Sequence, residues 1–369
     1  MIASWQLSSP PPAKIEHIDG YVVRWLHVPY SNSMGFGRRL AAFLRFMALA
    51  TWHACGTPAD LVFATSTPLT VVIPGAIASW LRRSPWVLEV RDLWPEVPIA
   101  MGELRNPVAK WLARGLARLG YRSASHVITL SIGMRDGVLR CGVDEAHVSV
   151  IPNLADLDRF SPDKSDPEQF LDRMPFLRGR PIIMYAGTIG RANGMRYLVR
   201  IAAEALASSS DVVFCILGDG AERDALHSLA IELGVLDRNL FVRPPIPKLE
   251  LPSALGSATV CLSFVIDVPE LWNNSANKFF DAMAAGKPIA INHEGWQADL
   301  LRSTGAGIVL PPSDPATAWH ELSTFISDTE RISAAGRSAR KVAGERFSRF
   351  DLACRFERTL VNVLDRAAP

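Results

Sequence analysis

Short apolar runs alternate with amphipathic segments along most of this chain, and this alternation constrains its fold more than any other feature. In the first half, buried strands are predicted at 60–64, 86–90, 126–129 and 148–151, with helices over 71–81 and 109–122. Strands that alternate with helices form parallel βαβ units. Ligands of such sheets bind beyond the carboxyl ends of the strands. Polar residues stand at those ends, namely Arg91, Asp92, Ser131 and Asn153.

A second series of the same kind begins at residue 182. Strands are predicted at 182–186, 212–217, 240–243, 259–264, 289–291 and 307–310, with helices between and after them. The polar, proline-bearing residues 161–180 are interpreted as a linker. The sequence therefore predicts an α/β protein of two domains, 1–160 and 181–346. Residues 1–20, which contain a run of three prolines, are expected to be irregular.

Composition excludes several classes of protein. The 39 basic and 37 acidic residues leave a net charge of +2, which gives no general attraction to nucleic acid. The five cysteines are scattered without a C-x-x-C pair, which argues against a disulfide scaffold or a zinc site and suits the cytoplasm. No apolar run reaches the roughly 18 residues of a membrane span, and no signal peptide is apparent.

Two polar loops at predicted strand-to-helix turns are candidate phosphate sites. One is the glycine-rich loop 187–194, and the other is 273–278, where Asn274, Ser275 and Asn277 are all suitable N-cap residues. Free backbone N–H groups and the helix dipole favour an anion at such a turn. Arg191 and Lys278 can add charged donors from two sides of a diphosphate. The alternative is an ordinary helix–strand unit that binds nothing.

Two helices are basic as well as apolar. The predicted helix 38–53 carries three arginines, and the helix 109–122 carries a stripe of residues four apart, formed by Lys110, Arg114, Arg118 and Arg122. Such faces can lie on anionic lipid. They can equally be the solvated faces of ordinary core helices.

Several motifs, taken together and in order, resemble a known family. They are Arg91-Asp-Leu-Trp-Pro-Glu96, Ile151-Pro-Asn153, Tyr185-Ala-Gly187, Leu217-Gly-Asp-Gly220, the run from Asn277 to Pro288, and Gly295-Trp-Gln-Ala-Asp299. They resemble those of the retaining, nucleotide-sugar-dependent glycosyltransferases of family 4, and most of all a bacterial branch that includes L-fucosamine (N-acetylfucosaminyl) transferases of O-antigen and capsule assembly. The resemblance covers about residues 21–366.

The resemblance implies a GT-B fold, in which two Rossmann-like domains with parallel sheets face each other across a cleft. The second domain would bind a nucleotide sugar, typically a UDP-sugar, and the first would face the acceptor. The closing segment 347–369 would form a helix that crosses back to the first domain. The acceptor would be a polyprenyl-diphosphate-linked or other saccharide, and the protein would lie in the cytoplasm or peripherally on the inner face of the plasma membrane.

The resemblance also implies a set of site residues. The catalytic group is expected to comprise Arg91, Asp92, Arg191 and Lys278. The nucleotide-sugar site is expected to comprise Gly187, Thr188, Gly190, Gly218, Asn273, Asn274, Ser275, Ala276, Asn277 and Asp281. Amides and basic side chains would stabilise the leaving diphosphate, so no metal or other cofactor is expected.

The chain departs from the family pattern in three places. The usual E-x7-E pair falls at Asn273 and Asp281, so one carboxylate is absent. The Arg and Lys of the first glycine loop fall at Thr188 and Asn193, which leaves Arg191 and Lys278 as substitutes. A strand, a Gly-Gly loop and a helix that precede the position of Tyr21 in typical members are expected to be missing from the N-terminus.

Two alternatives to a transferase follow from these departures. The first is a truncated, non-catalytic paralogue that binds nucleotide or membrane without turnover. The second is a nucleotide-sugar 2-epimerase, for which the predicted site is short of acidic residues.

Overall fold

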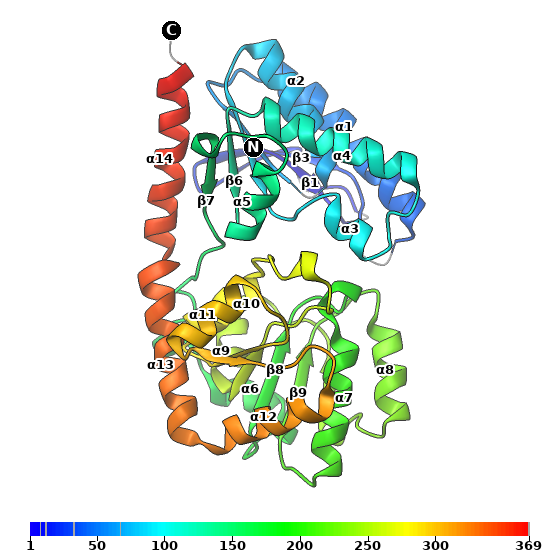
Figure 1. Cartoon of the computed structure of the whole chain (residues 1–369), viewed down its shortest axis with the longest axis vertical. Coiled ribbons are helices and arrows are strands. Elements are labelled where there is room, and N and C mark those ends of the chain that lie inside the picture. The colour runs from blue at the N-terminus through cyan, green and yellow to red at the C-terminus, as the bar shows by residue number, and fades with distance from the viewer. Residues whose placement is uncertain (8, 12, 32–33, 67, 368–369) are drawn as a thin grey trace. The chain divides into compact units, whose positions relative to one another are not determined.

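The computed structural model describes residues 1–369 apart from 8, 12, 32–33, 67 and 368–369 (Figure 1). The chain divides into two compact units, which are described separately below. Unit 1 comprises Met1–Ile151 and Arg355–Pro369, and unit 2 comprises Pro152–Cys354. No helix among the described residues is long and apolar enough to cross a membrane.

Unit 1 contains a parallel sheet of four strands in the order β4 (Val62–Thr65), β5 (Trp86–Val90), β6 (His126–Thr129) and β7 (Val148–Val150). Its helices are α1 (Phe36–Gly56), α2 (Val72–Arg82), α3 (Glu96–Ala100), α4 (Pro107–Ser123) and α5 (Ile132–Leu139), with the 3-10 turns η1 (Leu69–Val71) and η2 (Glu145–His147). The strands are apolar along their length because helices cover the sheet, and Trp86, Leu88 and Val127 are fully buried.

The N-terminal residues differ from the expectation of an irregular segment. β1 (Ile2–Trp5) pairs in parallel with β3 (Tyr21–His27), and β2 (Ile15–Ile18) pairs with β3 in antiparallel fashion. The three strands form a separate sheet in the order β1-β3-β2. The expectation was wrong because the proline-rich run follows β1 instead of interrupting it, so the prolines remove no hydrogen bond from that ladder.

Unit 2 contains a fully parallel sheet of six strands. In sheet order they are β10 (Leu240–Arg243), β9 (Val213–Leu217), β8 (Ile182–Ala186), β11 (Val260–Leu262), β12 (Ile289–Ile291) and β13 (Gly307–Val309). The chain order reverses beside β8, because β8 lies between β9 and β11. In doubly wound sheets such a switch point is where loops diverge and ligands bind.

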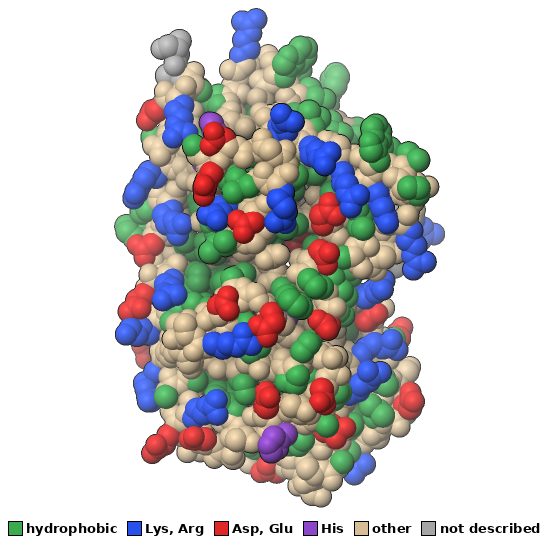
Figure 2. Space-filling model, in the orientation of Figure 1, with side chains coloured by type: hydrophobic (Ala, Val, Ile, Leu, Met, Phe, Trp, Pro, Cys, Tyr) green, Lys and Arg blue, Asp and Glu red, His purple; other side chains and the backbone are tan. Residues whose placement is uncertain are grey.

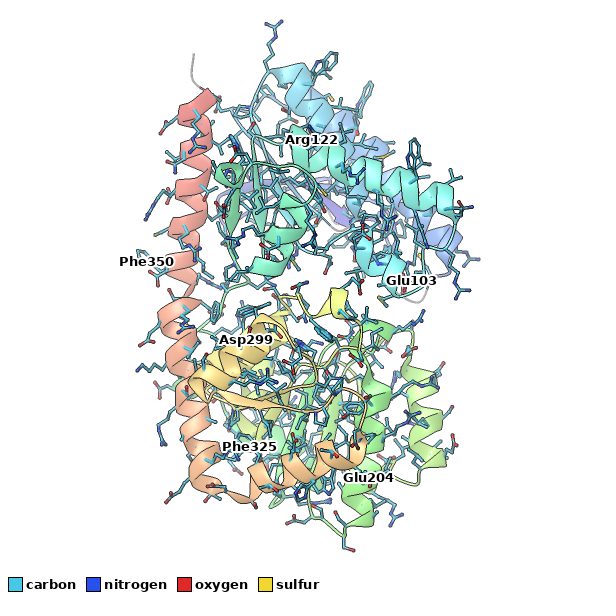
Figure 3. All side chains as sticks on the ribbon, in the orientation of Figure 1. Glu103, Arg122, Glu204, Asp299, Phe325 and Phe350 are labelled. Atoms are coloured by element: carbon cyan, nitrogen blue, oxygen red, sulfur yellow. The ribbon has the colours of Figure 1, made fainter. Side chains whose placement is uncertain are left out.

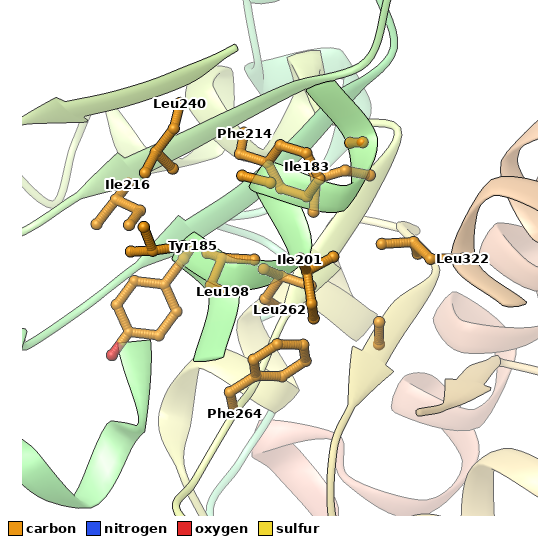
Figure 4. Packing of buried hydrophobic residues seen from close by; sticks show 14 of the residues in the cluster. Ile183, Tyr185, Leu198, Ile201, Phe214, Ile216, Leu240, Leu262, Phe264 and Leu322 are labelled. Atoms are coloured by element: carbon orange, nitrogen blue, oxygen red, sulfur yellow. The ribbon is translucent and has the colours of Figure 1, made fainter. Parts of the chain in front are cut away.

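The helices of unit 2 are α6 (Pro167–Arg173), α7 (Met195–Ala207), α8 (Arg223–Glu232), α9 (Leu251–Ser257), α10 (Asn277–Ala284), α11 (Trp296–Thr304), α12 (Pro315–Ser327) and α13 (Thr329–Arg346). The last helix, α14 (Arg349–Ala367), begins in unit 2, and its residues from Arg355 onward belong to unit 1. The core of unit 2 joins β8, β9 and α7 around Ile183, Phe214 and Leu198, which are fully buried (Figure 4).

Residues 161–180, expected to be a linker, are folded into unit 2. They form η3 (Pro162–Lys164), α6 and η4 (Pro175–Leu177), and they bury Phe170 and Leu177. Each of the three short helices has proline in its first turn, where the missing N–H costs no hydrogen bond. The prolines that suggested a linker are therefore helix starts.

Candidate functional site

Two glycine loops meet at the carboxyl ends of β8 and β9. The Gly187 amide donates to the Leu217 carbonyl at 3.0 Å, and the Ile189 amide donates to the Asp219 carbonyl at 2.9 Å. A Cβ atom at Gly218 would lie 2.0 Å from the Gly187 carbonyl oxygen. Glycine is therefore required at 218 by the close approach of two backbones. The outer side of the first loop is open, since Thr188 is exposed.

Lys278 lies over this loop although it belongs to another part of the chain. Its ammonium nitrogen, in the first turn of α10, donates to Asn193 Oδ1 at 2.7 Å and to the Tyr185 hydroxyl at 3.1 Å. The same nitrogen stands 4.6 Å from the centre of the Tyr185 ring. The Tyr185 hydroxyl, which points away from the apolar cluster in Figure 4, donates to the Thr188 carbonyl at 2.7 Å. The predicted loops 187–194 and 273–278 are thus brought together.

No carboxylate forms an ion pair with Lys278 within the part of the chain that the structure describes. Its two hydrogen-bond partners are neutral, and burial lowers the pKa of its ammonium group to about 7. A half-buried cation without a counter-ion is destabilised relative to water, and an anionic ligand would reverse that effect. An anion bound beside this ammonium group would therefore be stabilised by it.

The loop before α10 is held from three sides. The Asn274 carbonyl accepts from Trp296 Nε1 at 3.0 Å and from Gln297 Nε2 at 3.2 Å. Ser275 accepts on its hydroxyl from the Asn153 amide at 3.3 Å and on its carbonyl from Asn153 Nδ2. These contacts position the residues expected to meet the donor, and they explain the Ile-Pro-Asn and Gly-Trp-Gln-Ala-Asp motifs in physical terms.

The expected N-caps of α10 were wrong. The helix begins at Asn277 with Ala276 at the N-cap, and no side chain caps it. Asn274 instead accepts from the Ala276 amide at 3.2 Å, and the Ser275 hydroxyl is engaged by Asn153. Both side chains therefore stabilise the loop, and the first turn of α10 is left without a side-chain acceptor. Asn273 is half-buried in the same loop, directly after η6 (Pro269–Leu271) and Trp272.

Asp281 lies one turn along α10 from Lys278, and both line a small enclosed space beside Ala186 and Leu262. Its carboxylate makes no hydrogen bond or ion pair within the described part of the chain. Burial raises the pKa of this carboxyl to about 6, against the opposing effect of Arg159 and with a smaller contribution from Asp156. An unpartnered, half-buried carboxylate in this place is suited to accept hydrogen bonds from ligand hydroxyl groups.

Replacing Asp281 by asparagine is expected to stabilise the fold above pH 6. The folded-state pKa of Asp281 is raised, so its contribution to stability is present below the unfolded pKa of 3.8 and is lost as the pH rises through about 6. Asparagine removes this loss, which for a half-buried group is of the order of 1–2 kcal/mol. Urea unfolding at pH 4 and pH 8 measures the effect. Equal stability of the two proteins at pH 8 would contradict it.

The candidates in unit 1 lie at the end of β5. The Arg91 amide donates to the Ser66 hydroxyl at 3.0 Å, and the Arg91 guanidinium lies 3.8 Å from Glu89. Asp92 follows directly, and its carbonyl accepts from the Trp94 amide at 2.9 Å. Ser131, at the end of β6, is the N-cap of α5 and accepts from the Met134 amide at 3.3 Å. The hydroxyl of Ser131 thus has a local structural role.

Arg191 does not share a cavity with Lys278. It lines a space of about 360 Å³ together with Arg196, Tyr197 and Arg200 of α7 and residues 265–267. The two cations of the predicted clamp therefore face different spaces in this structure. Arg191 belongs to the glycine loop itself, whereas Lys278 reaches that loop from α10 through Asn193 and Tyr185.

Sequence reasoning did not assign roles to Tyr185, Trp296 or Gln297, although all three stand within the motifs that carried the resemblance. Tyr185 stands in a continuous run of buried residues in β8, and so it looks like a core aromatic in the sequence. No group of three or more His, Cys, Asp or Glu side chains able to hold a metal ion occurs among the residues that the structure describes.

Comparisons with known proteins agree with this architecture. Residues 4–154 match the family model of the glycosyl transferase 4-like domain, and residues 180–328 match that of glycosyl transferases group 1. A probable glycosyltransferase of Pseudomonas aeruginosa, WbjE, is 26% identical over 325 residues, which cover 86% of this chain and 78% of that protein. The 2-deoxystreptamine glucosyltransferase of Streptomyces kanamyceticus is 24% identical over 302 residues, covering 79% and 74%.

Solved structures share the fold. HepE of Anabaena, in complex with UDP-glucose, superposes with a TM-score of 0.71 at 20% identity, over 86% of this chain and 82% of that one. Sucrose-phosphate synthase of Thermosynechococcus elongatus gives a TM-score of 0.76 at 18% identity, over 100% and 89%. Together with the parallel sheets of both units, these matches confirm the predicted GT-B fold with two Rossmann-like domains. The chain is thus a member of the GT-B glycosyltransferases, made of a glycosyl transferase 4-like domain followed by a group 1 domain.

Proposed function

We propose that this glycosyltransferase moves a sugar from a UDP-sugar to a saccharide acceptor, with retention of the anomeric configuration. The observation that carries the proposal is the position of Lys278, a half-buried cation with only neutral partners, above an open glycine loop at the switch point of unit 2. HepE is bound to UDP-glucose in its structure, and this supports UDP as the nucleotide.

Charge develops on the leaving diphosphate as the bond between the sugar and the β-phosphate oxygen breaks. The Lys278 ammonium group and the amides of the glycine loop and of the first turn of α10 would stabilise that charge. Asp281 would accept hydrogen bonds from the ribose. Asn193 stands where the family has a lysine, and the Lys278 nitrogen lies 2.7 Å from its side chain. This supports Lys278 as the substitute cation.

The other predicted residues are assigned by the same reasoning. Gly187, Thr188, Gly190 and residues 273–277 would contact the diphosphate and the sugar. Arg91 and Asp92 of unit 1 would serve the acceptor. Arg191 would act beside the donor only if its side chain leaves the space that it shares with Arg196 and Arg200.

The acceptor is proposed to be a saccharide carried on a polyprenyl diphosphate, in the assembly of a bacterial surface polysaccharide. The donor sugar is proposed to be an N-acetylated amino sugar such as N-acetylfucosamine. The motifs shared with the fucosaminyl transferase branch support both proposals. The two curated relatives are named as glycosyltransferases and one solved structure as a synthase, so neither the epimerase nor the non-catalytic alternative gains support from these three names.

Purified protein is incubated with a lipid-diphosphate saccharide and a panel of UDP-, GDP- and ADP-sugars. It is expected to release UDP from a UDP-sugar and to form a product heavier by one sugar. Proton NMR of the product should show the donor's anomeric configuration, and EDTA should leave the rate unchanged. Transfer from GDP- or ADP-sugars alone would contradict the choice of nucleotide. An inverted product would contradict retention. Absence of transfer from every donor, together with no thermal shift by UDP, would contradict the proposal as a whole.

A further inference from the structure

Three tryptophans are exposed on three neighbouring helices of unit 1. Trp52 of α1 and Trp80 of α2 are each 78% exposed, and Trp111 of α4 is 73% exposed. Leu44, Leu81 and Leu112 are exposed on the same three helices. These six residues are called the three-helix face below. Large apolar side chains gathered on a surface in this way mark a binding site for a partner.

The three helices lie side by side. α2 contacts both α1 and α4, and the Val72 side chain of α2 fills the space over Gly120 of α4. The Arg82 guanidinium donates to the Cys55 carbonyl and so joins the last turns of α1 and α2. In Figure 2, several hydrophobic side chains and several Lys and Arg side chains lie in the upper right part of the view, where Figure 1 draws these helices.

The charge of these helices is of one sign. α1, α2 and α4 contain no Asp or Glu, whereas they carry eight Lys and Arg residues. The whole chain has a net charge of only +2, so the rest of the chain is net negative. Arg45 is exposed on α1, Arg83 is exposed directly after α2, and Arg122 is exposed on α4, where Figure 3 labels it.

Exposed tryptophans together with charge of one sign distinguish between kinds of partner. A second copy of the same face would bring like charges together in a dry interface, which opposes association. An anionic bilayer offers apolar volume at the depth of the lipid chains and negative phosphates above it. Tryptophan is enriched at that boundary, and Lys and Arg stems reach from it to the headgroups.

We propose that the three-helix face docks on an anionic lipid bilayer, with the tryptophans in the headgroup region and the basic residues on the phosphates. The face differs from the basic stripe predicted on α4. Arg114 of that stripe is bound to Glu96 through two hydrogen bonds of 3.1 Å, so its charge is already compensated. The three tryptophans and the absence of Asp and Glu within the three helices now carry the inference, which does not depend on the donor or the acceptor.

The test uses full-length protein and vesicles of phosphatidylcholine, with or without phosphatidylglycerol, in the absence of donor and acceptor. The wild type is expected to sediment with the anionic vesicles, to bind them less in high salt, and to have its tryptophan fluorescence quenched by brominated lipid. The triple variant Trp52→Ser, Trp80→Ser, Trp111→Ser should bind about tenfold more weakly or worse. All three side chains are exposed, so circular dichroism should confirm that this variant is folded.

A matched control removes exposed apolar side chains elsewhere. Leu249 is 87% exposed. Phe350, which lies on α14 and is labelled in Figure 3, is 77% exposed. The double variant Leu249→Ser, Phe350→Ser should bind vesicles as the wild type does. Equal vesicle binding by the triple variant would overturn the proposal, as would failure of the wild type to bind anionic vesicles. A dimer that the triple variant converts to monomer would also overturn it, because a second copy would then be the partner.

Discussion

Replacing Lys278 by methionine is expected to lower the affinity for UDP about 10- to 150-fold at pH 7. A charged hydrogen bond to the diphosphate contributes about 1.5–3 kcal/mol, and methionine keeps most of the side-chain volume without the charge. The fold should not be weakened. The Tyr185 hydroxyl retains its acceptor at Thr188, and the cost of a half-buried ammonium group disappears. Calorimetric titration with UDP, together with thermal unfolding, measures both quantities.

Lys287 provides the matched control for this variant. It follows the other end of α10, is also half-buried, and also has a pKa lowered by burial. Lys287→Met should therefore leave UDP affinity unchanged. If Lys278→Met bound UDP as tightly as the wild type, or if both lysine variants lost affinity equally, Lys278 would not be the residue that receives the diphosphate.

Replacing Gly218 by alanine is expected to destabilise unit 2 by about 3 kcal/mol or more and to abolish UDP binding. The new Cβ atom would lie 2.0 Å from the Gly187 carbonyl oxygen, so one of the two loops must move. Backbone that is hydrogen-bonded on both sides of this contact cannot relax as a side chain can. The Gly187 loop would shift, and the amides offered to the diphosphate would shift with it.

Gly190 lies in the same loop and serves as the control for stability. A Cβ atom there would meet nothing closer than 3.6 Å, and its φ of −114° is open to any residue. Gly190→Ala should therefore unfold at the same urea concentration as the wild type, whereas Gly218→Ala should unfold at a lower urea concentration. Wild-type stability of Gly218→Ala would mean that the two loops are not locked together as described.

Much of the fold could be predicted because parallel strands buried on both faces leave a strong signal. The apolar runs at 86–90, 182–186 and 240–243 coincide with β5, β8 and β10 to the residue. Short helices left a weaker signal in the sequence. α3, α6 and α9 have five to seven residues each, too few for a helical period to repeat, and their prolines favoured loops.

The candidate site was predictable as a set of loops but not as a set of contacts. The two loops were expected to meet, and Lys278 does lie against Asn193, 85 residues away in sequence. The sequence could not reveal that Asn274 and Ser275 would be engaged by the loop and by Asn153, because N-cap residues and loop-stabilising residues are of the same types. Nor could it reveal the direction of the Arg191 side chain, since both cations stand at suitable positions along the chain.

Proton uptake on UDP binding tests the central claim most directly. At pH 8.5 a Lys278 side chain with a pKa of about 7 is almost uncharged, and a bound diphosphate would return its pKa toward the ordinary 10.5. Asp281, with a pKa of about 6, stays ionised at this pH and does not contribute. Calorimetric titrations in two buffers of different ionisation enthalpy should give an uptake of about one proton by the wild type and none by Lys278→Met. UDP binding without proton uptake, or equal uptake by both proteins, would contradict the assignment of Lys278 to the diphosphate.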